Sequence, residues 1–532
     1  MDDNNFIKSS MVMAIGTITA RITGLIRGLL VVALLGTALL GDTFNVANTM
    51  PNILYNLLVG GALTSVFMPQ IVRSLRDEDG GDGFISRLYT ISLFFLLVIT
   101  TLGVIFSPAL VNLYAPEFSG RPEFDITVTL MRLCLPQVFF LGLFAVLGQI
   151  ANAKNRFGPM MWAPVVNNLT SIILLVWLLS VQGQWNISSI AYSDLVFLGV
   201  GTTLSYSLQA FILYPVVKKS GVKLKLILDW RNTFIIKSLK LASWSFIYAA
   251  ISQLSYLVTV IVSTSAAVKS LNNGINYGVG FTPYANAYLI LLVPHSIVTV
   301  SVVTAMLPRL SNYVLDKKFS EFNNLIYRCT KLVGVFTIPA SLIFLSFGPL
   351  IARSIFIGIT NEDANYLGLI LSAFALGLIP VSINLILLRA FNAFEDIKTQ
   401  VVINLIMNIV SVLISFLIGI YVEPRWVTFG LAAVFTFHYF IGISLSAFLI
   451  KKHGIKLKIK DLVLFYMKIF SISVVIIAPL WLNRNSLPGG NIIQLTIVLT
   501  LTLVLFLLAA KVFRINEVSS LVRAVLFKRK GE

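Results

Sequence analysis

Apolar residues fill almost the whole chain in long runs, which short polar segments interrupt. A bilayer core takes about 20 apolar residues per helix. Fourteen runs are long enough to cross it, at approximately 10–37, 44–72, 88–113, 126–152, 160–181, 193–217, 238–264, 280–308, 326–348, 364–388, 400–421, 427–450, 461–482 and 492–513. The pattern predicts an all-α integral membrane protein with about fourteen transmembrane helices.

The composition agrees with this pattern. Of the 532 residues, 57% are hydrophobic and only 12% are charged, about half the charged fraction of a soluble domain. No room remains for a sizeable soluble domain. Two aspartates precede the first apolar run, which itself holds Arg21 and Arg27 and lacks a small-residue cleavage site. We therefore expect a first helix and not a cleaved signal peptide.

The basic residues are distributed unevenly between the two sides of the membrane. When the N-terminus is placed in the cytoplasm, 32 of the 40 lysines and arginines fall on inner loops or the C-terminal tail, and 5 fall on outer loops. This asymmetry predicts that both termini are cytoplasmic, in a multi-pass protein of the cell membrane. It also accounts for the net charge of +18 by a basic inner surface that faces membrane lipids, so no nucleic-acid partner is expected.

Two short patterns recur at nearly the same separation. Val66–Pro69 and Ala305–Pro308 end the second and eighth runs, 239 residues apart. Ala151–Ala153 and Phe391–Ala393 come after the fourth and tenth runs, 240 residues apart. The agreement favours a duplication of six helices, although chance similarity between apolar helices is the alternative. Parallel repeats are typical of two-lobed transporters. The predicted divisions are an N-lobe over 1–232, a C-lobe over 233–455, and two further helices with a basic tail over 456–532.

Arg21 and Arg27 lie well inside the first apolar run. Arg21 is about 16 Å from the start of that helix. An intramembrane charge costs at least about 2.5–3.5 kcal/mol, so it usually faces a partner or a water-filled cavity. A guanidinium matches the oxygens of a phosphate, which favours a phosphate-binding pair. The alternative is a structural role, in which the arginines pair with Asp42 or with backbone carbonyls.

Polar residues also mark the beginning of the second run. Asp42 is either part of a cavity or an ordinary helix cap. Asn45, Asn48 and Asn52 follow it at spacings of three and four residues, and therefore share one face of a helix. A polar face on a membrane helix indicates a cavity or a hydrogen-bonded partner helix. We take Arg21, Arg27, Asp42, Asn48 and Asn52 as candidate substrate-binding residues.

Signatures of catalysis and metal binding are missing from the sequence. No helix clusters histidine, cysteine or carboxylate ligands at metal-binding spacing, and no nucleotide-binding or hydrolase motif is present. We expect no cofactor, no metal and no enzymatic activity. One rival class, a membrane glycosyltransferase, would require paired acids in the outer loops, and we identify no such pair. Another, a structural partner of the division machinery, would not require intramembrane arginines.

Several segments resemble one bacterial transporter family. The stretches Ala20–Arg27, Gly41–Ala47 and Met50–Asn52 are similar to the first two helices of the MurJ (MviN) lipid II flippases, of the actinobacterial type. Further similar stretches are Gly60–Leu63, Phe67–Pro69, Asn152–Pro159 and Ala163–Asn168. The resemblance covers essentially the whole chain. The chain departs from the family at Tyr55 and Asn56, where a basic residue is frequent, and at 288–293, which lack an expected arginine.

The resemblance implies membership of the multidrug/oligosaccharidyl-lipid/polysaccharide exporter superfamily. It implies two six-helix lobes around a cationic central cavity, alternating access, and a role in peptidoglycan and cell-wall synthesis. The implied cargo is lipid II, the undecaprenyl-diphosphate-linked disaccharide-pentapeptide. Arg21, Arg27 and Asp42 match cavity and gate positions of the family, and Asn52 matches a polar position beside them. Cell-wall synthesis and division proteins are the implied partners. The alternatives are flipping of another lipid-linked oligosaccharide and drug export.

Overall fold

A computed structural model describes residues 3–57, 68–187, 190–227, 234–275 and 277–518. Every regular element in these ranges is a helix, as the sequence predicts. The chain forms two compact units, Met1–Thr282 and Pro283–Glu532. The predicted lobe boundaries at 232 and 455 concern the repeat and stay a prediction.

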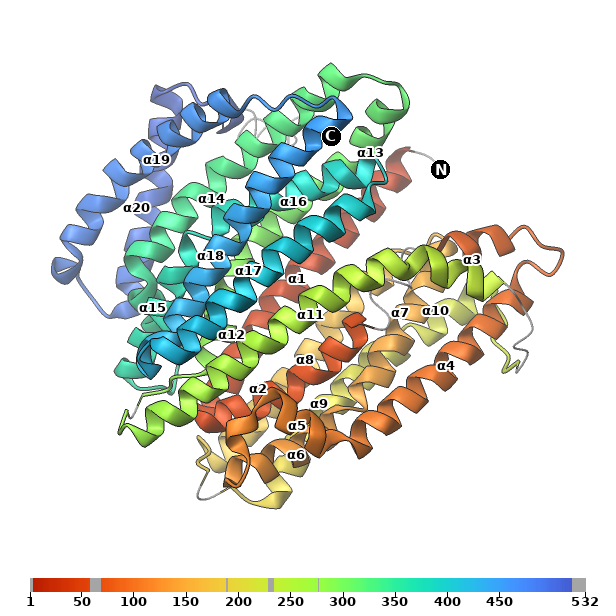
Figure 1. The fold of residues 1–532 in the computed structure, drawn as a ribbon, viewed down its shortest axis with the longest axis horizontal. Coiled ribbons are helices and arrows are strands. Elements are labelled where there is room, and N and C mark those ends of the chain that lie inside the picture. The colour runs from red at the N-terminus through yellow and green to blue at the C-terminus, as the bar shows by residue number, and fades with distance from the viewer. Residues whose placement is uncertain (1–2, 58–67, 188–189, 228–233, 276, 519–532) are drawn as a thin grey trace. The chain divides into compact units, whose positions relative to one another are not determined.

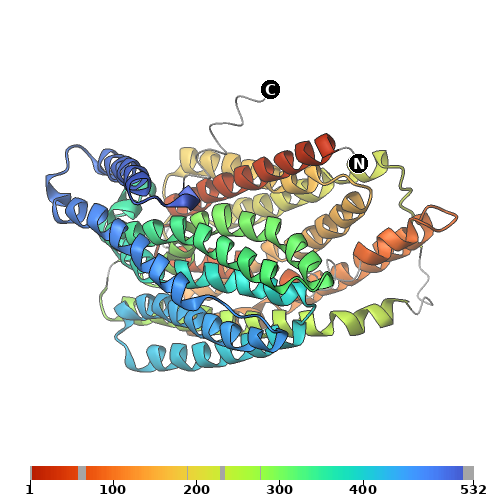
Figure 2. The same cartoon turned by 90° about the horizontal axis from the view of Figure 1, so that it is seen from above.

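Among the residues that the structure describes, the first unit contains eleven complete α-helices (Figure 1). In chain order they are α1 (Asp3–Leu35), α2 (Leu39–Tyr55), α3 (Met68–Ser74), α4 (Asp82–Ile105), α5 (Ser107–Tyr114), α6 (Pro122–Cys134), α7 (Gln137–Ala153), α8 (Gly158–Gln182), α9 (Tyr192–Phe211), α10 (Tyr214–Lys219) and α11 (Phe234–Asn272). A short 3-10 turn, Pro116–Phe118, separates α5 from α6. Figure 2 shows α1, in red, running alongside the orange-yellow α8, and these two helices pack together over much of their length.

The second unit continues the helical pattern. Its helices are α12 (Phe281–Pro294, whose first two residues belong to the first unit), α13 (Val300–Leu315), α14 (Phe319–Ile355), α15 (Asn361–Ala375), α16 (Leu378–Ala393), α17 (Ile397–Tyr421), α18 (Pro424–Leu449), α19 (Ile459–Leu482) and α20 (Asn491–Val512). A π-helical turn, His295–Thr299, joins α12 to α13, and a 3-10 turn, η5 (Ile450–His453), follows α18. In this unit α19 and α20 pack against each other and against α14.

The described helices supply nearly all the predicted membrane crossings. Twelve continuous segments are long and apolar enough to span a bilayer, and the bent pair α15 and α16, which meet at 45°, makes a thirteenth. The remaining predicted span, 44–72, includes α2 and α3, but residues 58–67 lie outside the described residues. The prediction of an all-α membrane protein with about fourteen spans is confirmed.

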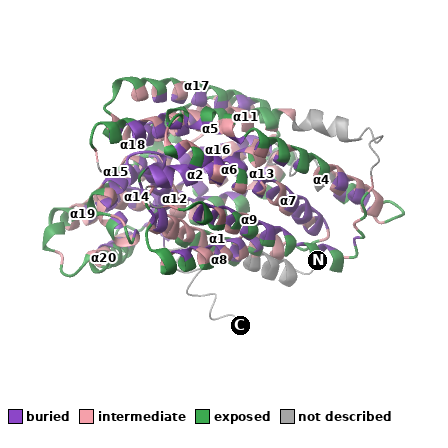
Figure 3. Cartoon of the chain, turned by 90° about the horizontal axis from the view of Figure 1, so that it is seen from below, coloured by how far each residue is buried: buried purple, intermediate pink, exposed green. Residues whose placement is uncertain are grey.

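Apolar side chains occur in two environments, in the buried cores and on the exposed faces of helices. Each unit has a core of fully buried side chains, for example Ile85 and Leu147 in the first unit and Phe322 and Phe391 in the second. Large apolar side chains also stay exposed along the outward faces of helices such as α4 and α17 (Figure 3). In water such faces would be costly. In a bilayer they are the surface that contacts lipid.

Local structure supports the duplication. The loops that precede α8 and α17 contain Asn155 and Glu395, 240 residues apart, and both have positive φ, 60° and 55°. The next residue in each loop donates its backbone N–H to the carbonyl five residues before it: Arg156 to Ala151 at 2.9 Å and Asp396 to Phe391 at 3.0 Å. A π-helical turn also begins at Asn56 in one copy and at His295 in the other, 239 residues apart. Matching backbone irregularities are stronger support for a repeat than similar apolar composition.

Candidate functional site

Arg27 lies beside a small cavity in the first unit, which is lined mainly by apolar side chains. Its side chain is half-buried on α1, and it lines the cavity together with Asn48 of α2. The other lining residues come from α1, α2, α8 and α9: Val31, Phe44, Ser171, Leu174, Leu175, Leu198 and Thr202. The cavity measures about 20 Å³, which is room for about one water molecule. Among the described residues, Arg27 forms no ion pair.

Arg21 has different surroundings, although it lies on the same helix. Its side chain is exposed, and it does not line the cavity of Arg27. The two arginines are six residues apart, which turns them about 120° from each other around the helix axis. A stripe formed by both arginines is therefore absent from this part of α1.

The face of α1 between the arginines packs against α8 through one amide. Asn168 donates its Nδ2 hydrogens to the carbonyl of Ala20 at 2.9 Å and to Thr23 Oγ1 at 3.0 Å. A Cβ at Gly24 would lie 3.4 Å from that nitrogen, so the glycine leaves room for the amide. This contact fixes α1 against α8 and so positions Arg27.

Asp42 is completely buried and binds the beginning of another helix. Its two carboxylate oxygens accept the backbone N–H groups of Phe281, at 3.0 Å, and Thr282, at 2.6 Å. These N–H groups belong to the first turn of α12, where the helix itself provides no acceptor. The carboxylate also faces the positive end of the helix dipole.

Asn45 makes two further hydrogen bonds near the junction between Asp42 and the beginning of α12. Asn45 donates to Thr282 Oγ1 at 3.0 Å and to the carbonyl of Gly41 at 3.0 Å. A Cβ on Gly280, whose φ is +144°, would lie 2.2 Å from the carboxylate of Asp42. In the structure Asp42 neither caps its own helix nor pairs with Arg27, and its predicted place in a substrate cavity stays a prediction. Its own helix begins after Ala38 without a side-chain cap, and its partners are 239 and 240 residues away.

Asn48 and Asn52 make modest contacts. Asn48 accepts a hydrogen bond from Gln137 of α7 at 3.3 Å, and Asn52 donates to the carbonyl of Asn48 at 3.5 Å. Both side chains are half-buried. The structure thus brings Arg27 and Asn48 to one cavity, and places Arg21, Asp42 and Asn52 elsewhere. A role of all five in binding substrate stays a prediction.

Sequence reasoning missed several buried polar residues next to these candidates. Gln137 is fully buried and reaches Asn48, while Asn167 donates to Gln209 Oε1 at 2.8 Å. Thr202 and Ser171 line the cavity of Arg27. A usable signal was present, because amides in an apolar span usually face a partner helix.

Two tyrosines of α12 pack against aromatic rings, one of them at position 288, where the sequence comparison led us to expect an arginine. Tyr284 and Tyr288 pack on Phe374 with ring centroids 4.9 and 5.8 Å apart. Tyr288 also packs edge-on against Phe435 at 5.5 Å. Within 288–293, Tyr288 therefore contributes aromatic packing, and the cationic residues among the candidates, Arg21 and Arg27, both lie on α1.

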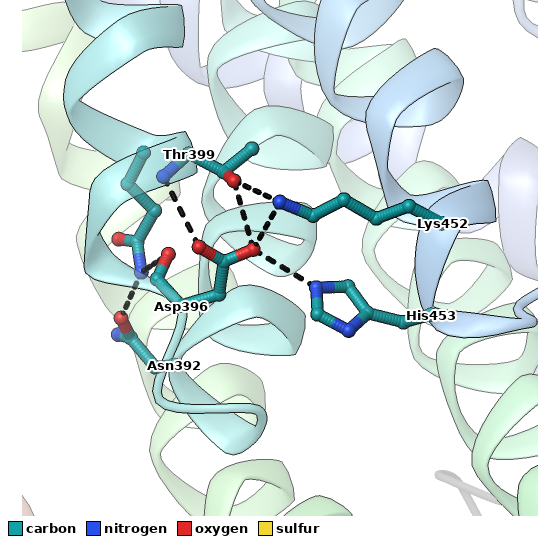
Figure 4. Close-up of polar contacts among 6 residues, drawn as sticks. Asn392, Asp396, Thr399, Lys452 and His453 are labelled. Atoms are coloured by element: carbon teal, nitrogen blue, oxygen red, sulfur yellow. Dashed lines mark hydrogen bonds and ion pairs between the residues drawn. The ribbon is translucent and has the colours of Figure 1, made fainter.

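A polar cluster outside the spans joins two loops of the second unit (Figure 4). Asp396 precedes α17 and accepts hydrogen bonds from the backbone and hydroxyl of Thr399, at 3.1 and 2.8 Å. Lys452 and His453 of η5 reach the same carboxylate, at 2.6 and 2.9 Å. Burial alone would raise the pKa of Asp396, but these hydrogen bonds outweigh it and hold the pKa below its usual value.

Comparison with known proteins places the chain in a family. The sequence pattern of the family described as "Lipid II flippase MurJ" matches residues 31–509. A "Probable lipid II flippase MurJ" of Rickettsia prowazekii is 27% identical over 419 residues, which cover 77% of this chain and 78% of that protein. A protein of the same description from Buchnera aphidicola subsp. Baizongia pistaciae is 22% identical and covers 92% of this chain and 91% of its own.

Solved structures agree in fold. A structure described as "Lipid II flippase MurJ, inward closed conformation" superposes with a TM-score of 0.76 at 22% identity, and covers 95% of this chain and 99% of that one. An inward-facing multidrug resistance MATE family transporter of the MOP superfamily gives 0.64 at 14% identity, over 82% and 95% of the two chains. The family pattern extends over most of the chain, from the last turns of α1 into α20. The chain therefore belongs to the lipid II flippase MurJ family.

Proposed function

We propose that this chain moves lipid II from the inner to the outer leaflet of the bacterial cell membrane by alternating access. The observation that carries the proposal is the match of the lipid II flippase pattern to residues 31–509. The membrane-spanning helices of the fold are the necessary setting, since a diphosphate cannot cross about 30 Å of hydrocarbon unaided.

Arg27 is the group that we assign to the diphosphate. It is a permanent cation inside a membrane-spanning helix, and no carboxylate of the described residues neutralises it. Its planar guanidinium can donate two parallel hydrogen bonds to phosphate oxygens. Asn48, on the same cavity, offers an amide beside it. The present cavity holds about one water, so cargo entry requires α1, α2, α8 and α9 to separate there.

Arg21 serves an earlier step in this proposal. Its exposed position lets it attract the diphosphate before Arg27 binds it. The polyprenyl tail remains in the lipid throughout. Outward movement of an anion is favoured by a potential that is negative inside, by about 2.3 kcal/mol per charge per 100 mV.

Asp42 is the proposed latch between α2 and α12. Its buried carboxylate and the amide of Asn45 join the first turns of the two helices. Release of two backbone N–H groups inside the protein is costly unless water replaces the carboxylate. The junction therefore favours one state, and cargo binding must supply the free energy that opens it.

The proposed orientation has both termini in the cytoplasm, which rests on the distribution of basic residues. In this orientation the Asp396 cluster and the loop before α14 face the cytoplasm. Cell-wall synthesis proteins on the outer side would receive the cargo.

Complementation tests the cargo in cells. A bacterial strain depleted of its own lipid II flippase should grow when it expresses this chain, and should not grow when it expresses the Arg27→Ala variant at an equal level. A chain that accumulates in the membrane but does not restore growth, while it supports export of another lipid-linked oligosaccharide, would favour that second cargo. Other members of the fold carry different substrates, which makes this comparison necessary.

A further inference from the structure

The segment between α10 and α11 is extended and lies along α4. We call residues 222–227 the strap. Backbone N–H groups of the strap donate hydrogen bonds to three side chains that lie one helical turn apart on α4: Asp82, Ser86 and Thr90. Ser86 Oγ donates to the carbonyl of Lys223 and accepts the N–H of Lys225, both at 3.1 Å. Thr90 Oγ1 accepts the N–H of Ile227 at 2.9 Å.

These contacts fix the direction of the side chains on the strap. Gly221 makes the turn into the strap with φ +87°, and Val222 is buried with 3% of its surface exposed. Asp82 accepts the N–H of Lys223 at 3.3 Å, so the backbone of this lysine is bonded on both sides. The side chains of Lys223 and Lys225 are directed to the surface and exposed.

A cavity of about 330 Å³ lies between the strap and α10, within the first unit. Its lining residues are Tyr214, Lys218, Gly221, Val222, Lys223 and Leu224. This volume lies within the range of small-molecule pockets, about 300–1,000 Å³. Among the described residues, neither Lys218 nor Lys223 pairs with a carboxylate. Two ammonium groups that form no ion pair among the described residues line one cavity, which favours an anionic ligand.

The surroundings indicate where the ligand comes from. Phe211 and Ile212, just before α10, are 53% and 44% exposed, and Leu226 on the strap is 74% exposed. Exposed apolar chains beside lysines are typical of a segment at the boundary between lipid tails and headgroups. The cavity shares no lining residue with the cavity of Arg27. Its anion is therefore part of a molecule whose tails lie in the bilayer.

We propose that this cavity binds the phosphate of an anionic phospholipid headgroup, held by Lys218 and Lys223, with the Tyr214 hydroxyl as a further donor. Ammonium groups suit a phosphodiester because they need no planar geometry. The side chain missing from Gly221 leaves the entrance open, since no atom lies within 4 Å of the position its Cβ would occupy. The strap keeps Lys223 in place, so the site depends on hydroxyls of α4 that do not touch the ligand. The proposal does not depend on the cargo of the transporter.

Lipid retention tests the site on the purified full chain. The protein is exposed to vesicles of phosphatidylglycerol or of phosphatidylcholine, and bound lipid is counted by native mass spectrometry. We expect Lys218→Gln/Lys223→Gln to lose the preference for phosphatidylglycerol by about tenfold. Lys219→Gln is the matched control, because this neighbour is equally exposed and lies outside the cavity. An unchanged preference in the double variant, or an equal loss in Lys219→Gln, would overturn the proposal.

Two further experiments test whether the cavity binds a lipid headgroup specifically. Ser86→Ala keeps every charge but removes the hydroxyl that bonds the strap, so it should also weaken retention, whereas a merely electrostatic surface would not respond. Inorganic phosphate should not displace the lipid at millimolar concentration. Displacement by phosphate, with the same dependence on Lys218, would show a free-anion site and contradict the lipid assignment. Unchanged melting temperatures in phosphatidylcholine establish that the variants are folded.

Discussion

Arg27 is a charged side chain in a membrane-spanning helix, and it lines a small cavity together with the polar residues Asn48, Ser171 and Thr202. The helix that carries it, α1, is fixed by the amide of Asn168, and the amide of Asn48 lines the same cavity. A charged side chain within a membrane span is costly, and it usually binds an anionic substrate or pairs with a carboxylate. The carboxylate that could have paired with it, Asp42, bonds α12 instead. This leaves the arginine available to a cargo.

Substitutions at Arg27 test whether transport depends on its positive charge or on the planar shape of its guanidinium. Arg27→Ala should lower lipid II transport by about 10- to 100-fold, the worth of a charged hydrogen-bond pair. The protein should still accumulate, because loss of an intramembrane charge favours insertion. The transport rate of Arg27→Lys should lie between those of Arg27→Ala and the wild type. Lysine keeps the positive charge but lacks the planar guanidinium, which can donate two parallel hydrogen bonds. Arg425→Ala, an exposed outer arginine paired with Glu423, is the control. Normal transport by both single variants, Arg21→Ala and Arg27→Ala, would contradict the assignment of these arginines to the diphosphate.

Asp42→Asn tests the latch between α2 and α12. An amide can accept only one of the two N–H groups, so a buried donor loses its partner at a cost of about 1–3 kcal/mol. The melting temperature should fall, while Asp125→Asn, at an exposed acid on α6, should leave it unchanged. Because Arg27 and Asp42 are not paired, their effects should add in Arg27→Ala/Asp42→Asn. Recovery of transport in that double variant would show that they are coupled.

The helices could be predicted from the sequence better than their contacts. The lengths of the apolar runs predict the spans because a bilayer imposes a minimum length. The position of Arg21 and Arg27 within a span is likewise visible in the sequence. The partners of Asp42 are not, because 239 residues separate them and nothing local specifies which N–H groups are free. The same holds for Asn168, whose amide holds α1.

The loop before α17 contains another contact that the sequence does not reveal. Asp396 is only 14% exposed and bonds Lys452 and His453 of η5, 56 and 57 residues later. In the matching loop of the first unit the equivalent residue is Arg156, which is exposed. The two loops therefore share their backbone structure, whereas among the described residues the carboxylate of the second loop is the one bonded to η5.

Acidification should weaken this cluster. The pKa of Asp396 is lower in the folded protein than the value near 3.9 expected for an unfolded chain. Its contribution to stability is therefore present above that pH and is lost as the pH falls through the folded pKa. Asp396→Asn should lower the melting temperature at pH 7, and the difference from wild type should shrink below about pH 4. Asp316→Asn, at an exposed acid paired with Lys318, is the control. A difference that grows on acidification would contradict the sign of the shift.

On the scale of the whole molecule, orientation decides which leaflet delivers the cargo. The loop between α13 and α14 is exposed and carries Lys317 and Lys318. A cysteine at Lys317 should react with a membrane-impermeant maleimide only after the cells are opened, because basic loops face the cytoplasm. A cysteine at Arg484, in the loop between α19 and α20 that we predict to lie outside, should react in intact cells. Labelling of position 317 from outside would reverse the topology.

Transport of lipid II itself tests the central claim most directly. The purified chain is reconstituted in liposomes with labelled lipid II on one leaflet, and its arrival on the other leaflet is followed. We predict movement well above that in protein-free liposomes, and its loss in Arg27→Ala at equal incorporation. A wild-type rate equal to that of empty liposomes, in vesicles where the chain moves a different lipid-linked oligosaccharide, would contradict the account.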